Sequence, residues 1–330
     1  MQQMERELSL TEVFKFTFEI LRRNFRVVVV PYLIGAVTLS IVILPFWPSI
    51  VGLRDEILAL VTQRFSLADL PQLIRLIVRM ASFAVVYLLL EWVIKTFFDG
   101  VGVKVVDDAI AGKKTRLRIV FSAVTRRLFS LLAASFLVGL LVISTLGVFS
   151  LGLILGFASG STLGMTVSVF TGAAVSIVLL VVFALLFSMV LPAVVIEGAG
   201  GLWSLIRSKR LTSRRKGKVF AIFAVYAIIL MVFSSLVEGV LSPLVLPITV
   251  NNFVKNLANV LPNSLYAIIL TTTYHSLRAR EMSGRAGLPI PTTTSQTEVA
   301  VLTQCPNCGA PVLDEYHFCT NCGHRIRLWT

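Results

Sequence analysis

The amino-acid sequence predicts an all-α polytopic membrane protein with six transmembrane helices, interfacial amphipathic helices and a small cysteine-rich module at the C-terminus. Three observations support this prediction. Residues 128–196 form a run of 69 positions without Asp, Glu, Lys or Arg. Charged residues make up only 14% of the chain and hydrophobic residues 56%, whereas soluble domains carry about 25% charged residues. All four cysteines lie in the last 26 residues, as two Cys-x2-Cys pairs.

The uncharged run defines the middle of the membrane domain. One span needs about 20 apolar residues, so we place two long spans here, at Phe129–Leu155 and Met165–Val195. A turn of small residues at Gly156–Gly164 separates them. Three spans would also fit the length, but they would put the next basic loop on the wrong side of the membrane.

Four other spans are predicted from the remaining apolar runs, at Val27–Leu44, Met80–Phe98, Val219–Leu241 and Asn263–Leu277. A loop, Phe46–Asp69, follows the first span outside the membrane, and a basic loop is expected from Asp99. The last span is short. It could include the preceding segment Thr249–Leu261, which we interpret as an Asn-rich helix at the outer interface, through a kink at Pro262.

The N-terminal segment Ser9–Arg26 has the pattern of an amphipathic helix. Ser9 and Glu12 have the spacing of a capping box, and the helix is expected to lie in the membrane interface before the first span. The alternative is that it extends that span. Basic segments of the same kind lead into later spans, so Glu12–Pro31, Leu117–Phe136 and Leu202–Val225 form a weak threefold repeat.

The distribution of Lys and Arg predicts the orientation. With the N-terminus in the cytoplasm, 24 of the 30 cations lie on the inner side and five on the outer side, and Lys95 lies within the second span. Positive residues collect on the cytoplasmic side of membrane proteins. We therefore expect a multi-pass protein of the cell membrane with both termini cytoplasmic.

The C-terminal part divides into two segments after a transmembrane domain at residues 1–280. Residues 281–304 are rich in Gly, Pro, Thr and Ser and are expected to form a flexible linker. Residues 305–327 contain Cys305, Cys308, Cys319 and Cys322, whose spacing predicts a closed tetrahedral Zn²⁺ site. Four thiolates leave no open coordination position, so the zinc is expected to be structural. A redox dithiol and an iron–sulfur cluster are the alternatives, and His317 and His324 are interpreted as bystanders.

Glu91 and Lys95 lie four residues apart within the second predicted span. Ionisable residues at membrane depth are costly and often functional. They could line a polar cavity or proton path. They could also form a structural pair near the inner leaflet, because the long Lys95 side chain can reach the interface.

Two other patterns concern packing and lipid. Gly152, Gly156, Gly160 and Gly164 repeat every four residues, which permits close helix packing. This face could join the two central spans or mediate oligomerisation. The basic run Arg207–Lys218 is expected to determine topology beside anionic lipid headgroups. The functional alternative is that it binds lipid headgroups directly. Nucleic acid is not expected as a partner.

No catalytic residues are predicted. The sequence contains neither a Gly-rich phosphate loop nor an HExxH motif, and its three histidines include only His275 near a span. With Tyr274, His275 is interpreted as an interface anchor. We therefore expect no enzymatic activity.

Two regions resemble known families. The cysteine module resembles the short zinc ribbon appended to many prokaryotic membrane and regulatory proteins. Residues 8–280 resemble the six-span domain fused to some glycerophosphoryl diester phosphodiesterases and found alone in uncharacterised prokaryotic relatives. The stretches that carry this resemblance are Thr11–Lys15 leading into Leu21–Phe25, Val195–Ser208 and Thr273–Arg278. The phosphodiesterase barrel has no counterpart here, so the resemblance implies a membrane module, associated with lipid, without the enzyme's activity.

Two functions follow as expectations. The first is a non-enzymatic membrane scaffold or adaptor whose cytoplasmic zinc ribbon binds a protein partner. The alternative is a transporter or lipid-handling protein with a polar site around Glu91 and Lys95. A polar cavity that reaches Glu91 would favour transport, whereas a fully packed bundle would favour the adaptor.

Overall fold

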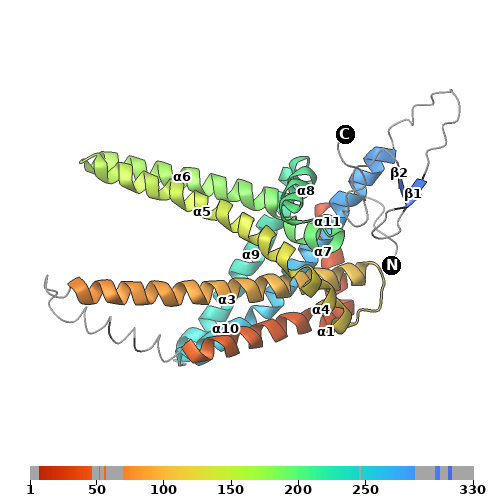
Figure 1. The fold of residues 1–330 in the computed structure, drawn as a ribbon, viewed down its shortest axis with the longest axis horizontal. Helices are drawn as coiled ribbons and strands as arrows, with labels where there is room; N and C mark the ends of the chain where they lie inside the picture. The colour runs from red at the N-terminus through yellow and green to blue at the C-terminus, as the bar shows by residue number, and fades with distance from the viewer. Residues whose placement is uncertain are drawn as a thin grey trace, which may run out of the picture.

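The computed structural model describes residues 7–46, 52, 56, 70–244, 247–286, 302–304 and 311–313, which are almost entirely helical (Figure 1). The helices and strands are α1 (Leu10–Ile43), α3 (Leu70–Ile110), α4 (Leu117–Arg126), α5 (Leu128–Ala158), α6 (Thr162–Phe187), α7 (Val190–Glu197), α8 (Gly201–Ser213), α9 (Lys216–Leu241), α10 (Ile248–Ala258), α11 (Val260–Ala286), β1 (Leu302–Gln304) and β2 (Pro311–Leu313), with 3-10 turns η1 (Leu44–Phe46) and η3 (Ser242–Leu244). Most of the predicted loop Phe46–Asp69 lies outside the described residues.

In the described part of the chain, five helical segments are long and apolar enough to cross a membrane. They are Leu10–Phe46, Ile74–Ile110, Leu128–Ala158, Thr162–Glu197 and Lys216–Leu244. The prediction of a sixth span at Asn263–Leu277 is not confirmed, since these residues belong to α11, which is too polar to qualify.

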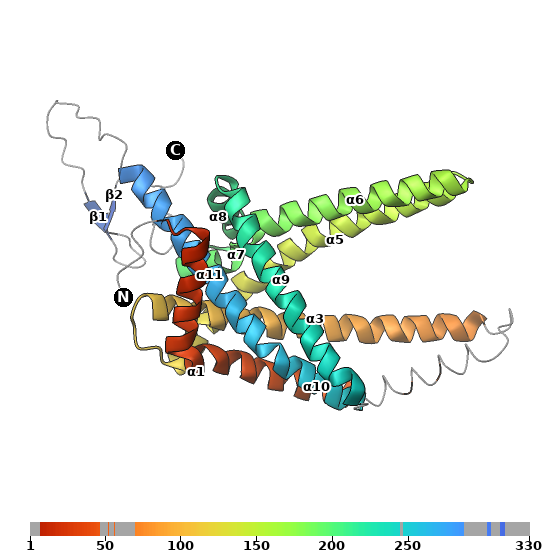
Figure 2. The same cartoon turned by 180° about the vertical axis from the view of Figure 1, so that it is seen from behind.

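Helix α11 nevertheless runs through the interior of the molecule. It packs against α1, α3, α9 and α10 (Figures 1 and 2). Its Ser264, Thr271, Thr272, Thr273 and Ser276 are completely buried. These hydroxyl groups are covered by other helices, and they make α11 too polar to meet a hydropathy threshold.

Helix α1 confirms the predicted capping box. The Ser9 side chain accepts a hydrogen bond from the Glu12 amide, and the Glu12 carboxylate accepts one from the Ser9 amide at 2.7 Å. The helix then kinks at Asn24, which has a non-helical φ of −121° and ψ of 23°. Figure 2 shows the first part of α1 running across the direction of the second part. This arrangement suits an interfacial helix leading into a span.

Breaks in the helices coincide with the three predicted repeats. Asn24 follows Arg22 and Arg23, Arg127 separates α4 from α5, and Arg215 separates α8 from α9. Each break therefore lies at or directly after a pair of arginines. This common position supports the repeat, in which a basic helix turns into a span.

Helix α3 continues beyond the predicted end of its span. The expected loop from Asp99 is wrong, because α3 extends to Ile110. Asp99-Gly100 and Val101-Gly102 are dipeptides that often mark breaks in a helix, but here both glycines serve close packing. A Cβ at Gly102 would collide with the Tyr32 ring and hydroxyl.

The fourth predicted span is interrupted between α6 and α7. Pro192 has no amide hydrogen to donate to the Ser188 carbonyl, so the helical hydrogen-bond ladder cannot continue unbroken. Ser208 of α8 repairs the gap, because its hydroxyl donates to the Leu186 carbonyl at 2.7 Å and accepts from the Met189 amide at 3.1 Å. Gly198 then ends α7 with φ at 73°.

The glycine repeat packs α5 against α6 within the chain. A Cβ at Gly152 would lie 2.9 Å from the Ser168 carbonyl oxygen and 3.0 Å from the Gly172 Cα, and Gly156 faces Met165 equally closely. This contact accounts for Gly152 and Gly156, the first two glycines of the four-residue repeat. Oligomerisation through the same face stays a prediction.

Leu in place of Gly152 is therefore expected to separate α5 from α6 and to lower stability, because overpacking costs about 1–3 kcal/mol. The matched control is Gly147→Leu on the same helix, where a Cβ would meet nothing within 4 Å. Thermal unfolding of both purified variants in detergent, followed by scanning fluorimetry, measures the difference. Equal melting temperatures would contradict the packing described here.

Candidate functional site

A polar cavity of about 120 Å³ lies where α1, α3, α10 and α11 meet. Its lining contains both ionisable residues singled out from the sequence, Glu91 and Lys95. The other lining residues are Tyr32, Gly35, Ala36, Leu39, Ile94, Phe98, Asp99, Asn256, Asn259, Val260 and Asn263. The structure thus brings the predicted pair to a cavity rather than to a packed interface.

Helix α3 supplies all three charged groups of the cavity. Glu91, Lys95 and Asp99 follow one another at four-residue intervals, so successive side chains lie one turn apart along nearly the same face. Lys95 lies between two carboxylates and interacts electrostatically with Asp99. With one cation and two anions, the cavity has a formal charge of −1.

Asparagines from α10 and α11 complete the polar lining. The spacing of Asn256, Asn259 and Asn263 is that of one helix face, and the Asn256 amide donates to the Ser40 hydroxyl at 3.3 Å. Of the asparagines expected at the outer interface, Asn256 and Asn259 line the cavity, while Val250 and Phe253 on α10 are exposed.

Tyr32 of α1 brings a hydroxyl to the inner end of this site. Its side chain is only 5% exposed, and its hydroxyl lies near the Asp99 carboxylate without a hydrogen bond of normal length to any described residue. The ring packs on Gly102 of α3 and lies near enough to Asp99 for electrostatic interaction. A buried polar group without a partner is uncommon in folded proteins and indicates a bound water, an ion or a functional role.

The chemistry of this lining suits a small cation. Carboxylate, amide and phenol oxygens are hard ligands, which favour hard cations over transition metals. The volume corresponds to about four water molecules at about 30 Å³ each.

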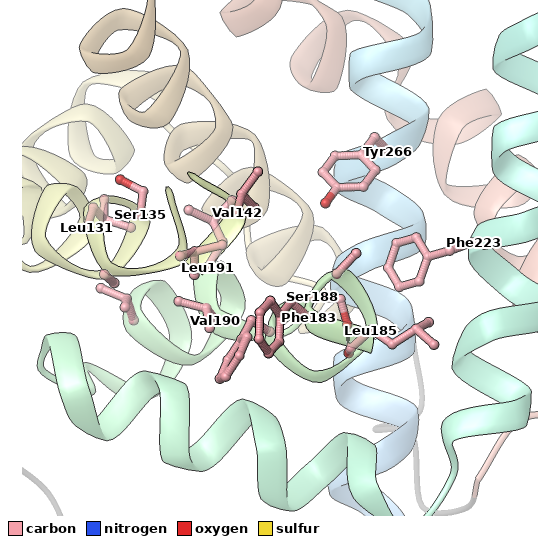
Figure 3. A pocket seen from close by; sticks show the side chains of 15 residues that line it. Leu131, Ser135, Val142, Phe183, Leu185, Ser188, Val190, Leu191, Phe223 and Tyr266 are labelled. Carbon is pink, nitrogen blue, oxygen red and sulfur yellow. Dashed lines mark hydrogen bonds between the residues drawn. The ribbon is translucent and has the colours of Figure 1, made fainter. Parts of the chain in front are cut away.

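A second, apolar cavity of about 420 Å³ lies among α5, α6, α7, α9 and α11. Figure 3 shows Leu131 and Val142 on one side and Phe223 on another, while Tyr266 points its hydroxyl towards the space. Ser135 and Ser188 are the other residues with hydroxyl side chains in the lining. No charged residue lines this cavity. It therefore has room for an apolar molecule but no charge that would orient one.

Ion pairs hold the inner ends of the helices together. Arg207 of α8 donates to both Glu197 oxygens, at 2.8 and 2.9 Å, and to Glu281 at 2.6 Å. Burial alone would lower the pKa of the Arg207 guanidinium, but these hydrogen bonds outweigh burial and raise the pKa above its ordinary value. Lys218 bonds Glu7 at 2.8 Å. Both ends of the basic run Arg207–Lys218 are thus engaged within the protein.

The predicted zinc ligands Cys305, Cys308, Cys319 and Cys322 lie outside the described residues. The strands on either side of the first cysteine pair are described. β1 and β2 form an antiparallel hairpin in which Leu302 pairs with Leu313 and Gln304 with Pro311. A hairpin whose turn carries the first Cys-x2-Cys pair fits a four-thiolate zinc site.

Comparison with known proteins gives two family matches. Residues 304–326 match a zinc-ribbon domain, which supports zinc binding by this segment. Residues 8–277 match a domain of unknown function, DUF7847. No curated protein and no solved structure shows significant similarity. Because the second match covers most of the sequence, the chain belongs to the DUF7847 family and carries a zinc-ribbon domain at its C-terminus.

Proposed function

We propose that this protein is a membrane transporter that binds a small monovalent cation, a proton or an alkali ion, in the polar cavity of α1, α3, α10 and α11. The observation that carries the proposal is the meeting of Glu91, Lys95 and Asp99 at this cavity. A charged side chain at the centre of a membrane helix costs about 3 kcal/mol. Three such residues on one helix are better explained by a hydrophilic ligand than by packing.

Lys95 has a specific role in this mechanism. Its ammonium group offsets one of the two carboxylates while the cavity is empty, so that the site presents only a single negative charge to the low-dielectric interior. A cation that enters replaces this ammonium group. Lys95 is exposed and its chain is long, so it can withdraw towards the solvent as the ligand binds.

The interrupted helix pair α6–α7 also favours transport. Transporters commonly contain discontinuous membrane helices, which allow one part of the bundle to move against another. Here a single side chain, Ser208, connects α8 to both sides of the interruption.

For topology, we propose six membrane crossings with both termini in the cytoplasm. The sixth would be α11, whose hydroxyl-bearing residues are covered by neighbouring helices. The 24 inner cations against five outer ones support this orientation. Under it, the zinc ribbon lies in the reducing cytosol, where thiolates persist as metal ligands.

A second candidate function rests on the C-terminal domain. The zinc-ribbon match at residues 304–326 supports a role as an adaptor that recruits a cytosolic partner, as expected from the sequence. An adaptor alone would not require charged residues around a cavity between membrane helices, so we place transport first.

Glu91→Gln is expected to reduce cation flux by about tenfold, because it removes charge that binds the ligand while keeping the size of the side chain. The full-length protein would be reconstituted in liposomes. Proton entry would be followed with an internal pH dye under a potassium diffusion potential, and sodium entry with radioactive sodium.

The matched control is Glu238→Gln, which neutralises a carboxylate that is 61% exposed at the far end of α9 and pairs with Lys255. Flux should be unchanged in this variant. If neither ion enters wild-type liposomes faster than empty ones, or if both variants behave alike, the proposal is wrong.

The zinc ribbon gives a separate prediction. Purified protein should contain one zinc per chain by inductively coupled plasma mass spectrometry. Cys305→Ser or Cys319→Ser should abolish it, because structural zinc requires all its ligands. His317→Ala should retain full zinc, since His317 is interpreted as a bystander. Zinc-free wild-type protein, or equal loss in His317→Ala, would contradict the four-cysteine site.

A further inference from the structure

Asp107 and His275 form a second buried polar site, inward of the cavity on the same two helices. His275 Nε2 lies 3.0 Å from Asp107 Oδ1, and both side chains are less than 20% exposed. Lys104 contacts Asp107 at 2.7 Å and Asp108 at 3.0 Å, and the Tyr274 ring packs edge-on against the His275 ring. The prediction that Tyr274 anchors at the membrane interface is wrong, because its side chain is completely buried.

The cavity and this pair are separated by a short distance along both helices. Asp99 and Asp107 are eight residues apart on α3, which corresponds to about 12 Å at about 1.5 Å per residue. On α11, Asn263 lines the cavity and His275 lies twelve residues further on. The two helices pack against each other, so the space between the sites lies along their contact.

Buried hydroxyl groups without partners occupy this interval. The Tyr32 hydroxyl packs at Gly102, one turn inward of Asp99 on α3. Thr271 lies one turn before His275 on α11, is completely buried, and its hydroxyl has no hydrogen-bond partner among the described residues. Leaving such a group unsatisfied is unfavourable in a folded protein, so both hydroxyls are suited to binding water inside the bundle.

We propose, building on the cation-transport function above, that Tyr32 and Thr271 support a hydrated proton path that connects the polar cavity with the Asp107–His275 pair. A proton leaves the cavity carboxylates, passes along the waters held by these hydroxyls, and reaches the imidazole of His275. Each relay group accepts one proton and releases one, so the path is unchanged after each transfer. Imidazole is suited to the inner end because its two ring nitrogens allow it to accept a proton at one atom and release a proton from the other.

The charged residues around His275 suit it to accept and release a proton. Asp107 stabilises the imidazolium that forms when the proton arrives. Lys104 holds Asp107 in place, and Asp108 shares the charge of Lys104. The proton can then be released to the cytoplasm at the inner surface of the protein, because α3 ends three residues beyond Asp107.

The sharpest test is Thr271→Val, which removes one hydroxyl and keeps the shape of the side chain. Folding should be unimpaired, because the lost hydroxyl had no partner. Proton flux into liposomes should nevertheless fall by about tenfold or more, within the usual contribution of a positioned proton-transfer group. The matched control is Thr145→Val. Thr145 is equally buried, but it lies on α5 and bonds its own helix at the Val142 carbonyl.

Asp107→Asn and His275→Gln test the inner end of the path, and the control is Glu19→Gln, which neutralises an exposed carboxylate of α1 that pairs with Arg23. The first two variants should slow proton flux, and the control should not. Full proton flux in Thr271→Val and His275→Gln, together with loss in Glu91→Gln, would overturn the path but leave transport standing. Sodium flux that depends on Glu91, without any proton flux, would likewise overturn the proton path and leave cation transport standing. Flux of both ions that is independent of Glu91 would reject both proposals.

Discussion

A charged side chain at the centre of a bilayer costs about 3 kcal/mol, and α3, a helix long enough to cross a membrane, carries three charged side chains within nine residues. The rest of the fold follows from this constraint. Helix α11 is polar, and it packs inside the bundle against α3 rather than facing lipid. Helices α5, α6 and α9 carry long exposed apolar surfaces. The charged groups thus meet amide and phenol groups instead of hydrocarbon.

The inner ends of the helices are fixed by a different kind of contact. Three carboxylates, Glu7, Glu197 and Glu281, form ion pairs with arginines and a lysine of α8, α9 and α11. Buried or half-buried pairs of this kind are strongly destabilised when one partner is removed. They therefore hold these helix ends together, whereas the α5–α6 hairpin extends away from the other helices (Figures 1 and 2). Helix α11 continues from this region towards the zinc ribbon.

Hydropathy and spacing predicted the apolar spans, the capping box and the Glu91–Lys95 pair, because each depends on residues close in sequence. Helix α11 was placed correctly but not confirmed as a span, since hydropathy measures composition and not what covers a helix. Asp99 was assigned to a loop because Asp-Gly is a turn signal, while Gly100 admits neighbouring side chains. Asn256 and Asn259 line the cavity only because the helices pack together there. Their spacing with Asn263 is that of one helix face and could have indicated a shared polar surface.

The central claim is that the cavity beside Glu91 and Asp99 binds a monovalent cation. Diffraction from crystals soaked in a thallium(I) salt tests it most directly, because thallium replaces alkali ions and is located by its anomalous scattering. For an alkali ion we predict an anomalous peak within coordination distance of the Glu91 and Asp99 carboxylates, absent in Glu91→Gln crystals, and for a proton we predict ordered water beside these carboxylates without a peak. A cavity without a peak, closed by Lys95 bonded to both carboxylates, would contradict the claim.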